Sequence, residues 1–117
     1  MIKLDVIKLA ADALEPVSAR GITVKQGWYD EKLKKTHITL WNVSDEEEGH
    51  SDDEATEEGQ VLQVNIWATY DALDLKKEVK TLMKKAGFYY QDGNDEQEKA
   101  DLFNKAMRFY YTAEMEE

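Results

Sequence analysis

The sequence predicts an α+β fold, with a single mostly antiparallel sheet of about five strands and two helices packed on one face of that sheet. Two segments carry apolar residues at helical spacing, and five shorter segments alternate apolar and polar residues. Their order along the 117 residues is α-β-β-β-α-β-β. A chain of this length is expected to form a single domain over residues 1–117, around one hydrophobic core.

The first element is a helix predicted over residues 2–14, where apolar side chains recur at helical spacing. Pro16 disfavours helical geometry at the residue before it, so it should end or kink this helix. Residues 22–29 then alternate as a strand. The polar connector at 30–35 suits a hairpin loop leading to the next strand, at 36–43.

A third strand is predicted at 60–67, with apolar residues on one face and amides on the other. The stronger of the two helices follows at 71–86, with Asp71 as a suitable N-cap and Gly87 in the left-handed position that often ends a helix. Its lysines form either a solvated outer face or a partner-binding face. The three that we take as candidate interface residues are Lys76, Lys80 and Lys84.

The last two strands are predicted at 88–91 and 106–113, joined by a turn at 92–95 and a polar connector at 95–104 that holds a helical turn near its end. Each of these strands contains a tyrosine pair, so one tyrosine of each pair should point into the core and the other outward. Outward tyrosines beside an arginine are typical either of an interface or of a capped sheet face. The candidate interface residues here are Arg108 and Tyr110.

The segment between the second and third strands is strongly acidic. The chain has 25 acidic and 15 basic residues, but only 16 acidic residues remain once residues 45–58 are set aside. Such dense like charge with little apolar surface predicts a solvated, disordered loop over 44–59. Its acidic residues form a candidate lumen-facing or partner-facing surface: Asp45, Glu46, Glu47, Glu48, Asp52, Asp53, Glu54, Glu57 and Glu58.

Composition and motifs point away from enzymatic chemistry, and we expect no catalytic residues, cofactor or metal site. The chain has no cysteine and two histidines, His37 and His50, which are too few for a zinc site. The run starting at Asp92 lacks the glycine and glutamate positions of a calcium loop, and the single glycines form no phosphate-binding loop. The acidic balance disfavours phosphate-driven nucleic-acid binding, and no apolar run is long enough to span a bilayer.

The order of motifs in the second half resembles that of the tail-terminator and tail-completion proteins of long-tailed phages. In that family, a strand with a polar residue between hydrophobic ones leads into an amphipathic helix that ends near Gly-Phe, and a strand with an Arg before aromatic residues closes the chain. The corresponding segments here are Val64-Asn65-Ile66-Trp67, 71–86, Gly87-Phe88 and Arg108-Phe109-Tyr110-Tyr111. The resemblance covers most of the chain through loose motifs, and the acidic segment departs from it.

This resemblance implies a non-enzymatic structural virion protein at the tail–head junction, made in the host cytoplasm. Such proteins form a ring, commonly a hexamer, that caps the tail tube and meets the connector at the neck of the head. DNA would pass through the ring without specific binding, so the acidic segment would either line the lumen and repel phosphate or dock on a basic partner. The alternative function is an acidic protein-binding module, or a DNA mimic that inhibits a basic partner.

Overall fold

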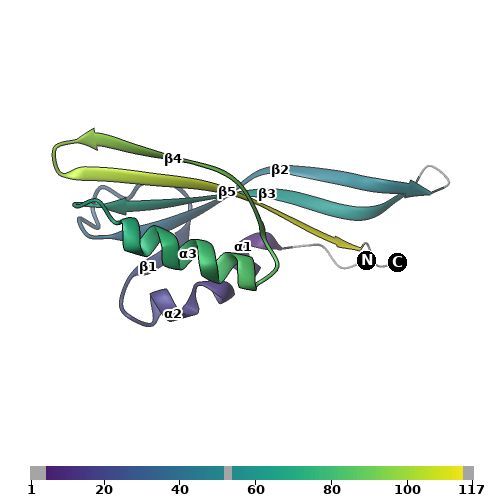
Figure 1. Ribbon diagram of the computed structural model, residues 1–117, viewed down its shortest axis with the longest axis horizontal. Helices are drawn as coiled ribbons and strands as arrows, with labels where there is room; N and C mark the ends of the chain where they lie inside the picture. The colour runs from purple at the N-terminus through teal and green to yellow at the C-terminus, as the bar shows by residue number, and fades with distance from the viewer. Residues whose placement is uncertain (1–4, 52–53, 115–117) are drawn as a thin grey trace.

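The computed structural model describes residues 5–51 and 54–114, and it shows one five-stranded mixed sheet with helices, as the α+β prediction required. The helices lie together on one side of the sheet (Figure 1). Among the described residues, no helix is long and apolar enough to cross a bilayer. The elements are α1 (Val6–Ala13), α2 (Glu15–Ser18), β1 (Thr23–Gln26), β2 (His37–Ser51), β3 (Glu54–Ala68), α3 (Leu73–Lys85), β4 (Tyr89–Lys99) and β5 (Leu102–Glu114).

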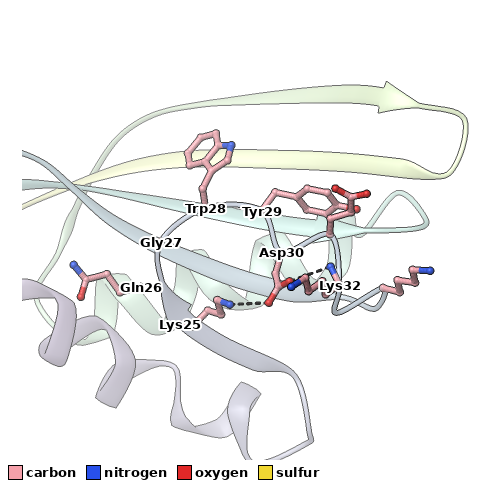
Figure 2. Close-up of a pocket in the computed structure, with 9 residues that line it drawn as sticks. Lys25, Gln26, Gly27, Trp28, Tyr29, Asp30 and Lys32 are labelled. Carbon is pink, nitrogen blue, oxygen red and sulfur yellow. Dashed lines mark hydrogen bonds and ion pairs between the residues drawn. The ribbon is translucent and has the colours of Figure 1, made fainter.

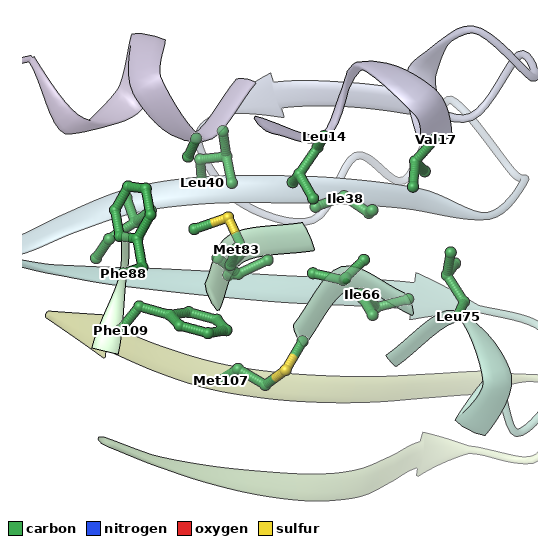
Figure 3. Close-up of a cluster of buried hydrophobic side chains, with 14 of the residues drawn as sticks. Leu14, Val17, Ile38, Leu40, Ile66, Leu75, Met83, Phe88, Met107 and Phe109 are labelled. Carbon is green, nitrogen blue, oxygen red and sulfur yellow. The ribbon is translucent and has the colours of Figure 1, made fainter. Parts of the chain in front are cut away.

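The hydrophobic core lies between the sheet and the helices α1 and α3. The alternation of β2, β3 and β5 turns one apolar set toward the helices, and α3 contributes Leu75, Val79 and Met83 from one stripe. Burying a side chain of this size contributes about 1.5–3 kcal/mol, so this layer supplies most of the stabilisation. Figure 3 shows the largest members of the cluster, among them Leu14, Ile38, Leu40, Ile66, Met107 and Phe109.

The sheet order is β1-β2-β3-β5-β4, and β1 pairs with β2 in parallel. The predicted hairpin loop at 30–35 is therefore wrong, and the predicted strand at 22–29 ends at Gln26. The chain leaves β1 at Gly27, whose φ of +130° favours glycine, and crosses the sheet before entering β2. An ion pair of 2.8 Å between Lys25 and Asp30 spans this connector (Figure 2).

The acidic segment is not a loop. β2 continues to Ser51 and β3 begins at Glu54, so the predicted loop at 44–59 is a β-hairpin, of which residues 52–53 lie outside the described part of the chain. The segment extends strands that are already paired in the body, and β5 pairs with the returning strand as far as Glu57. Its backbone N–H and C=O groups therefore form hydrogen bonds that continue the existing pairing of these strands. The hairpin projects beyond the helices, which makes the molecule 54 Å long and only 26 Å wide (Figure 1).

The predictions for the last third were partly wrong. The expected turn at 92–95 and most of the connector at 95–104 belong to β4, and the expected helical turn is the start of β5. Every residue from 91 to 101 is exposed, so no buried face imposes an apolar alternation on β4. β4 is an edge strand, and its many charges protect an edge that would otherwise pair with another chain.

The helix boundaries follow the predicted signals in most places. Pro16 lies in the first turn of α2, where a proline is tolerated, and it separates α2 from α1. Gly87 has a φ of +99° after α3, as predicted. Asp71 is not the N-cap of α3, because its carboxylate instead pairs with Lys105 at 2.6 Å. Residues 2–4 of the first predicted helix lie outside the described residues.

Candidate functional site

The face of the sheet opposite the helices, which we call the open face, carries the main candidate site. The strand pairing arranges its side chains in transverse rows across β2, β3, β5 and β4. One row runs from Trp41 through Gln63 and Arg108 to Asp92. The next two rows are Thr39, Asn65, Ala106 and Asn94, then His37, Trp67, Asn104 and Glu96. This face is therefore polar and aromatic, in contrast to the aliphatic face under the helices.

An aromatic cluster covers one part of the open face. The connector after β1 lays Trp28 edge-on against Trp67, with ring centroids 5.3 Å apart, and places Tyr29 5.0 Å from the same indole. Trp67 is buried and donates a hydrogen bond of 2.9 Å from Nε1 to the hydroxyl of Thr39. Trp28, by contrast, remains 54% exposed. The connector thus closes over Trp67 and presents a second indole to solvent.

His37 is a structural member of this cluster. Its Nδ1 donates to the carbonyl of Lys35 at 2.8 Å, because its Nε2 already accepts the backbone N–H of Asp30 at 3.2 Å. The ring also stacks on Tyr29 and is almost fully buried. Both ring nitrogens are engaged within the fold, and no group of metal-ligating side chains gathers anywhere in the part of the chain that the structure describes.

A chain of amides forms the floor beside the aromatic cluster. Gln63 donates from Nε2 to Oδ1 of Asn65 at 2.9 Å, and Asn65 donates from Nδ2 to Oδ1 of Asn104 at 2.9 Å. Asn65 and Asn104 are buried, so these hydrogen bonds offset the cost of placing amides there. The chain fixes the orientation of each amide and makes the floor rigid as well as polar.

A groove of about 430 Å³ lies above this floor, between Trp28 and the edge strand β4. Three carboxylates and one guanidinium line it, so its formal charge is −2. Asn94 donates a hydrogen bond of 2.9 Å to one of these carboxylates, that of Glu96. The charged lining residues are Asp92, Glu96, Glu98 and Arg108. An exposed indole, an arginine and a row of carboxylates along β4 suit recognition of a basic or amphipathic protein surface.

The structure separates the predicted interface residues into two layers. Arg108 is exposed in the groove, and Tyr110 lies further along β5 on the same face, with its ring over Gly59. Lys76, Lys80 and Lys84 lie on α3, on the opposite side of the sheet. The predicted division of the tyrosine pairs is confirmed: Tyr90 and Tyr111 pack against the core, whereas Tyr89 is 66% exposed.

Two of these lysines are engaged within the fold. Lys76 pairs with Asp95 at 2.7 Å, and the ammonium of Lys80 lies 3.9 Å from the ring centroid of Tyr90. Asp95 also accepts a hydrogen bond of 3.1 Å from Lys105. The hydrogen bond from Lys76 is the main reason that the pKa of Asp95 lies below its ordinary value. For Lys105, burial alone would lower the pKa, but hydrogen bonds to Asp71 and Asp95 outweigh it and raise the pKa.

The nine predicted acidic residues are distributed along the hairpin. Seven occupy β2 or β3, and Asp52 and Asp53 lie outside the described residues. The register places acidic residues at directly opposed positions, because Glu47 pairs with Glu58 and Glu48 with Glu57. Like charges at directly opposed positions generally destabilise a strand pair. The seven are Asp45, Glu46, Glu47, Glu48, Glu54, Glu57 and Glu58.

No protein-family model matches the chain, and no curated protein sequence matches it. A solved structure does: a chain of the structure described as "Virion of native gene transfer agent (GTA) particle" superposes with a TM-score of 0.64. The match covers 93% of this chain and 94% of that chain, at 13% sequence identity. At this identity the likeness shows a shared fold over nearly the full length of both chains.

Proposed function

We propose that the protein is a structural component of a phage-like virion, which forms a ring that caps the tail tube and joins the tail to the head. The single observation that carries this proposal is the fold shared, almost end to end, with a chain of a gene transfer agent virion. The tail-terminator-like order of motifs in the second half of the sequence supports the same assignment. The proposed partners are further copies of the chain, commonly six in such rings, the tail-tube protein and the neck connector.

The geometry suits a role in assembly. A ring requires each copy to contact its neighbours through two different surfaces. The described part of the chain has two such surfaces on opposite layers: the grooved open face and the outer side of α3. The carboxylates that line the groove stand on an edge strand and are exposed, so they are accessible to a neighbouring protein surface.

The test uses the tail-tube protein from the same genome, polymerised with and without the purified chain. We expect tubes of limited length, each with a ring at one end in electron micrographs. Tubes that elongate to the same length in the presence of the chain, with no bound ring, would overturn the proposal. Immunogold labelling of intact particles checks the location, since the label should lie at the junction of tail and head.

The hairpin of β2 and β3 has two proposed roles: lining the lumen or docking on a basic partner. Deleting residues 45–58 tests them, because it joins Ser44 to Gly59 and leaves a two-residue Gly-Gln connection before Val61, the partner of Ser44. Glycine first in such a connection suits a type II′ hairpin. If heads still join tails but DNA delivery falls, the lumen role holds; if joining is lost, the docking role holds.

The hairpin also favours the second candidate function, an acidic module that mimics DNA. A mimic needs its acidic groups at regular positions, and the structure places seven of them along paired strands. A strand repeats its faces every two residues, so such positions recur regularly. This candidate predicts a monomer that displaces DNA from a basic protein. A variant with glutamines at 46–48 and 57–58 keeps the length of the hairpin but removes its charge. If this variant no longer displaces DNA, the displacement depends on the acidic charge of the hairpin.

A further inference from the structure

The outer side of α3 is a continuous stripe that the fold leaves uncovered. Leu73, Lys77, Thr81 and Lys84 follow one another at helical spacing, and all four are exposed. Leu73 is 45% exposed, although it is a large hydrophobic residue. The buried residues of the helix lie on the other side, against the sheet. The stripe therefore has an apolar end at the start of α3 and a basic end at its C-terminus, where Lys85 adjoins it.

The lysines of this stripe differ from the other lysines of α3. Lys76 and Lys80 are held by Asp95 and by the ring of Tyr90. No ion pair joins Lys77, Lys84 or Lys85 to any other residue in the ranges that the structure describes. Three cations on one side of a helix, none of them in an ion pair with another described residue, make this stripe complementary to an acidic surface.

The groove on the open face has the opposite character. Its edge strand carries Asp92, Glu96 and Glu98, and the exposed indole of Trp28 lines its other side. A second exposed indole, that of Trp41, lies outside the groove lining on the strand beyond Gln63. The stripe from Leu73 to Lys84 rises about 17 Å along the helix axis. The acidic stretch of β4 from 92 to 98 extends about 20 Å. The two surfaces thus match in charge and in length.

We infer that the groove on the open face of one copy receives the outer stripe of α3 from the next copy. In this arrangement Leu73 meets the tryptophans, Asp74 approaches Arg108, and the lysines at the end of the helix approach Glu96 and Glu98. The two surfaces lie on opposite layers of the same chain, so the contact is head to tail and repeats from copy to copy until a ring closes. The inference rests on the proposed ring and names the contact that builds it.

Charge reversal with restoration tests the contact. One variant carries Lys84→Glu and Lys85→Glu, a second carries Glu96→Lys and Glu98→Lys, and all four sites are exposed, so both variants should fold. Sedimentation velocity at several protein concentrations, with and without tube protein, measures assembly. We expect each variant to weaken self-association by about tenfold or more, since attraction becomes repulsion. A mixture of the two variants should assemble again, because each supplies the surface that the other lacks.

The control matched to the Lys84 and Lys85 variant carries Lys32→Glu and Lys35→Glu, which makes the same change in net charge as that variant on exposed residues outside both surfaces. It should assemble like the unmodified chain. If the reversed variants assemble normally, or the control loses assembly to the same extent, the inferred contact is wrong while a ring through another surface still stands. If the unmodified chain forms no oligomer even with tube protein, both the contact and the proposed ring fail.

Discussion

The indole of Trp28 packs edge-on against that of Trp67, and this pairing joins the crossing connector to the centre of the sheet. Because β1 and β2 are parallel, the connector must run back past the sheet between them, and its contacts with Trp67 place it on the open face. The contact holds the connector against the sheet through apolar packing, and Trp28 also forms one wall of the groove. One aromatic pair thus links the topology of the sheet edge to the candidate docking surface.

The first prediction separates the two tryptophans. Trp67 is 3% exposed, so Trp67→Ala should cost about 3–5 kcal/mol in the free energy of unfolding, as is usual for a buried aromatic. Trp28→Ala should cost far less, because more than half of that side chain is already in water. Urea unfolding of both variants measures the difference. Equal costs would contradict the view that Trp67 is core and Trp28 is surface.

The second prediction concerns Gly59, over which the ring of Tyr110 lies. A Cβ at position 59 would overlap the phenol group, so Gly59→Ala should destabilise the protein by about 1–3 kcal/mol, as overpacking does. The same substitution in a Tyr110→Ala background should cost much less, because the obstructing ring is gone. A double-mutant cycle by chemical denaturation gives the coupling. Additive effects would show that the ring does not occupy this place.

The third prediction follows from the charge cluster beneath the start of α3, where Lys76 and Lys105 contact Asp95. The pKa of Asp95 is lowered, chiefly by its hydrogen bond from Lys76, so this group contributes stability above its unfolded pKa and loses it as the pH falls through the folded value. The pKa of Lys105 is raised, so its contribution is present below its unfolded pKa and is lost only at strongly alkaline pH.

The unmodified chain should therefore lose stability below about pH 4 more steeply than an Asp95→Asn variant does. The thermal midpoint, measured from pH 3 to pH 7, checks this. Asp12→Asn is a suitable control, because the ion pair of Asp12 with Lys8 on α1 is exposed and distant in sequence from this cluster. A control with the same loss of acid dependence as Asp95→Asn would show that the effect does not come from this cluster.

The sequence predicts those elements in which one buried face makes apolar residues recur at a regular spacing. The stripe of α3 and the alternation of β3 and β5 are strict because one face of each is in the core. β4 was mostly missed because both of its faces are exposed along residues 91–99, so its composition is that of a loop. The sequence does not predict the parallel pairing of β1, because the connector after it has the composition of a hairpin loop. The crossing follows from tertiary contacts such as that of Trp28 with Trp67.

The candidate site was harder to predict than the fold. Arg108 was identified from its neighbours in the sequence, but its groove combines residues from β3, β4, β5 and the connector after β1. They meet because β5 lies between β3 and β4, an order that local patterns do not contain. The tryptophan after Gly27 was the one available signal, since a large aromatic residue directly beyond a strand often covers a neighbouring surface. The sequence identifies the lysines of α3 as candidate interface residues. It does not show that Lys76 and Lys80 make contacts within the fold while Lys84 is exposed.

The last prediction concerns the acidic hairpin. Its sequence predicts a loop, because it is rich in acidic residues and has no alternation of apolar and polar residues. Its register opposes Glu47 with Glu58, Glu48 with Glu57, and Glu57 with Glu114 on the other side. Opposed like charges cost up to about 1 kcal/mol each in a strand pair, and salt screens them over a Debye length of about 10 Å at 0.1 M. Raising the ionic strength should therefore stabilise the hairpin.

Amide hydrogen exchange measures this directly. Protection of residues 45–51 and 54–59 should rise when sodium chloride is raised from about 10 mM to about 150 mM, whereas protection in α3 should change little. A variant with glutamines at positions 46–48 and 57–58 should show high protection at both salt concentrations, since the repulsion is removed and the register is kept. Protection that is independent of salt in the unmodified chain, or lower in the glutamine variant, would mean that the carboxylates do not oppose one another across these strands.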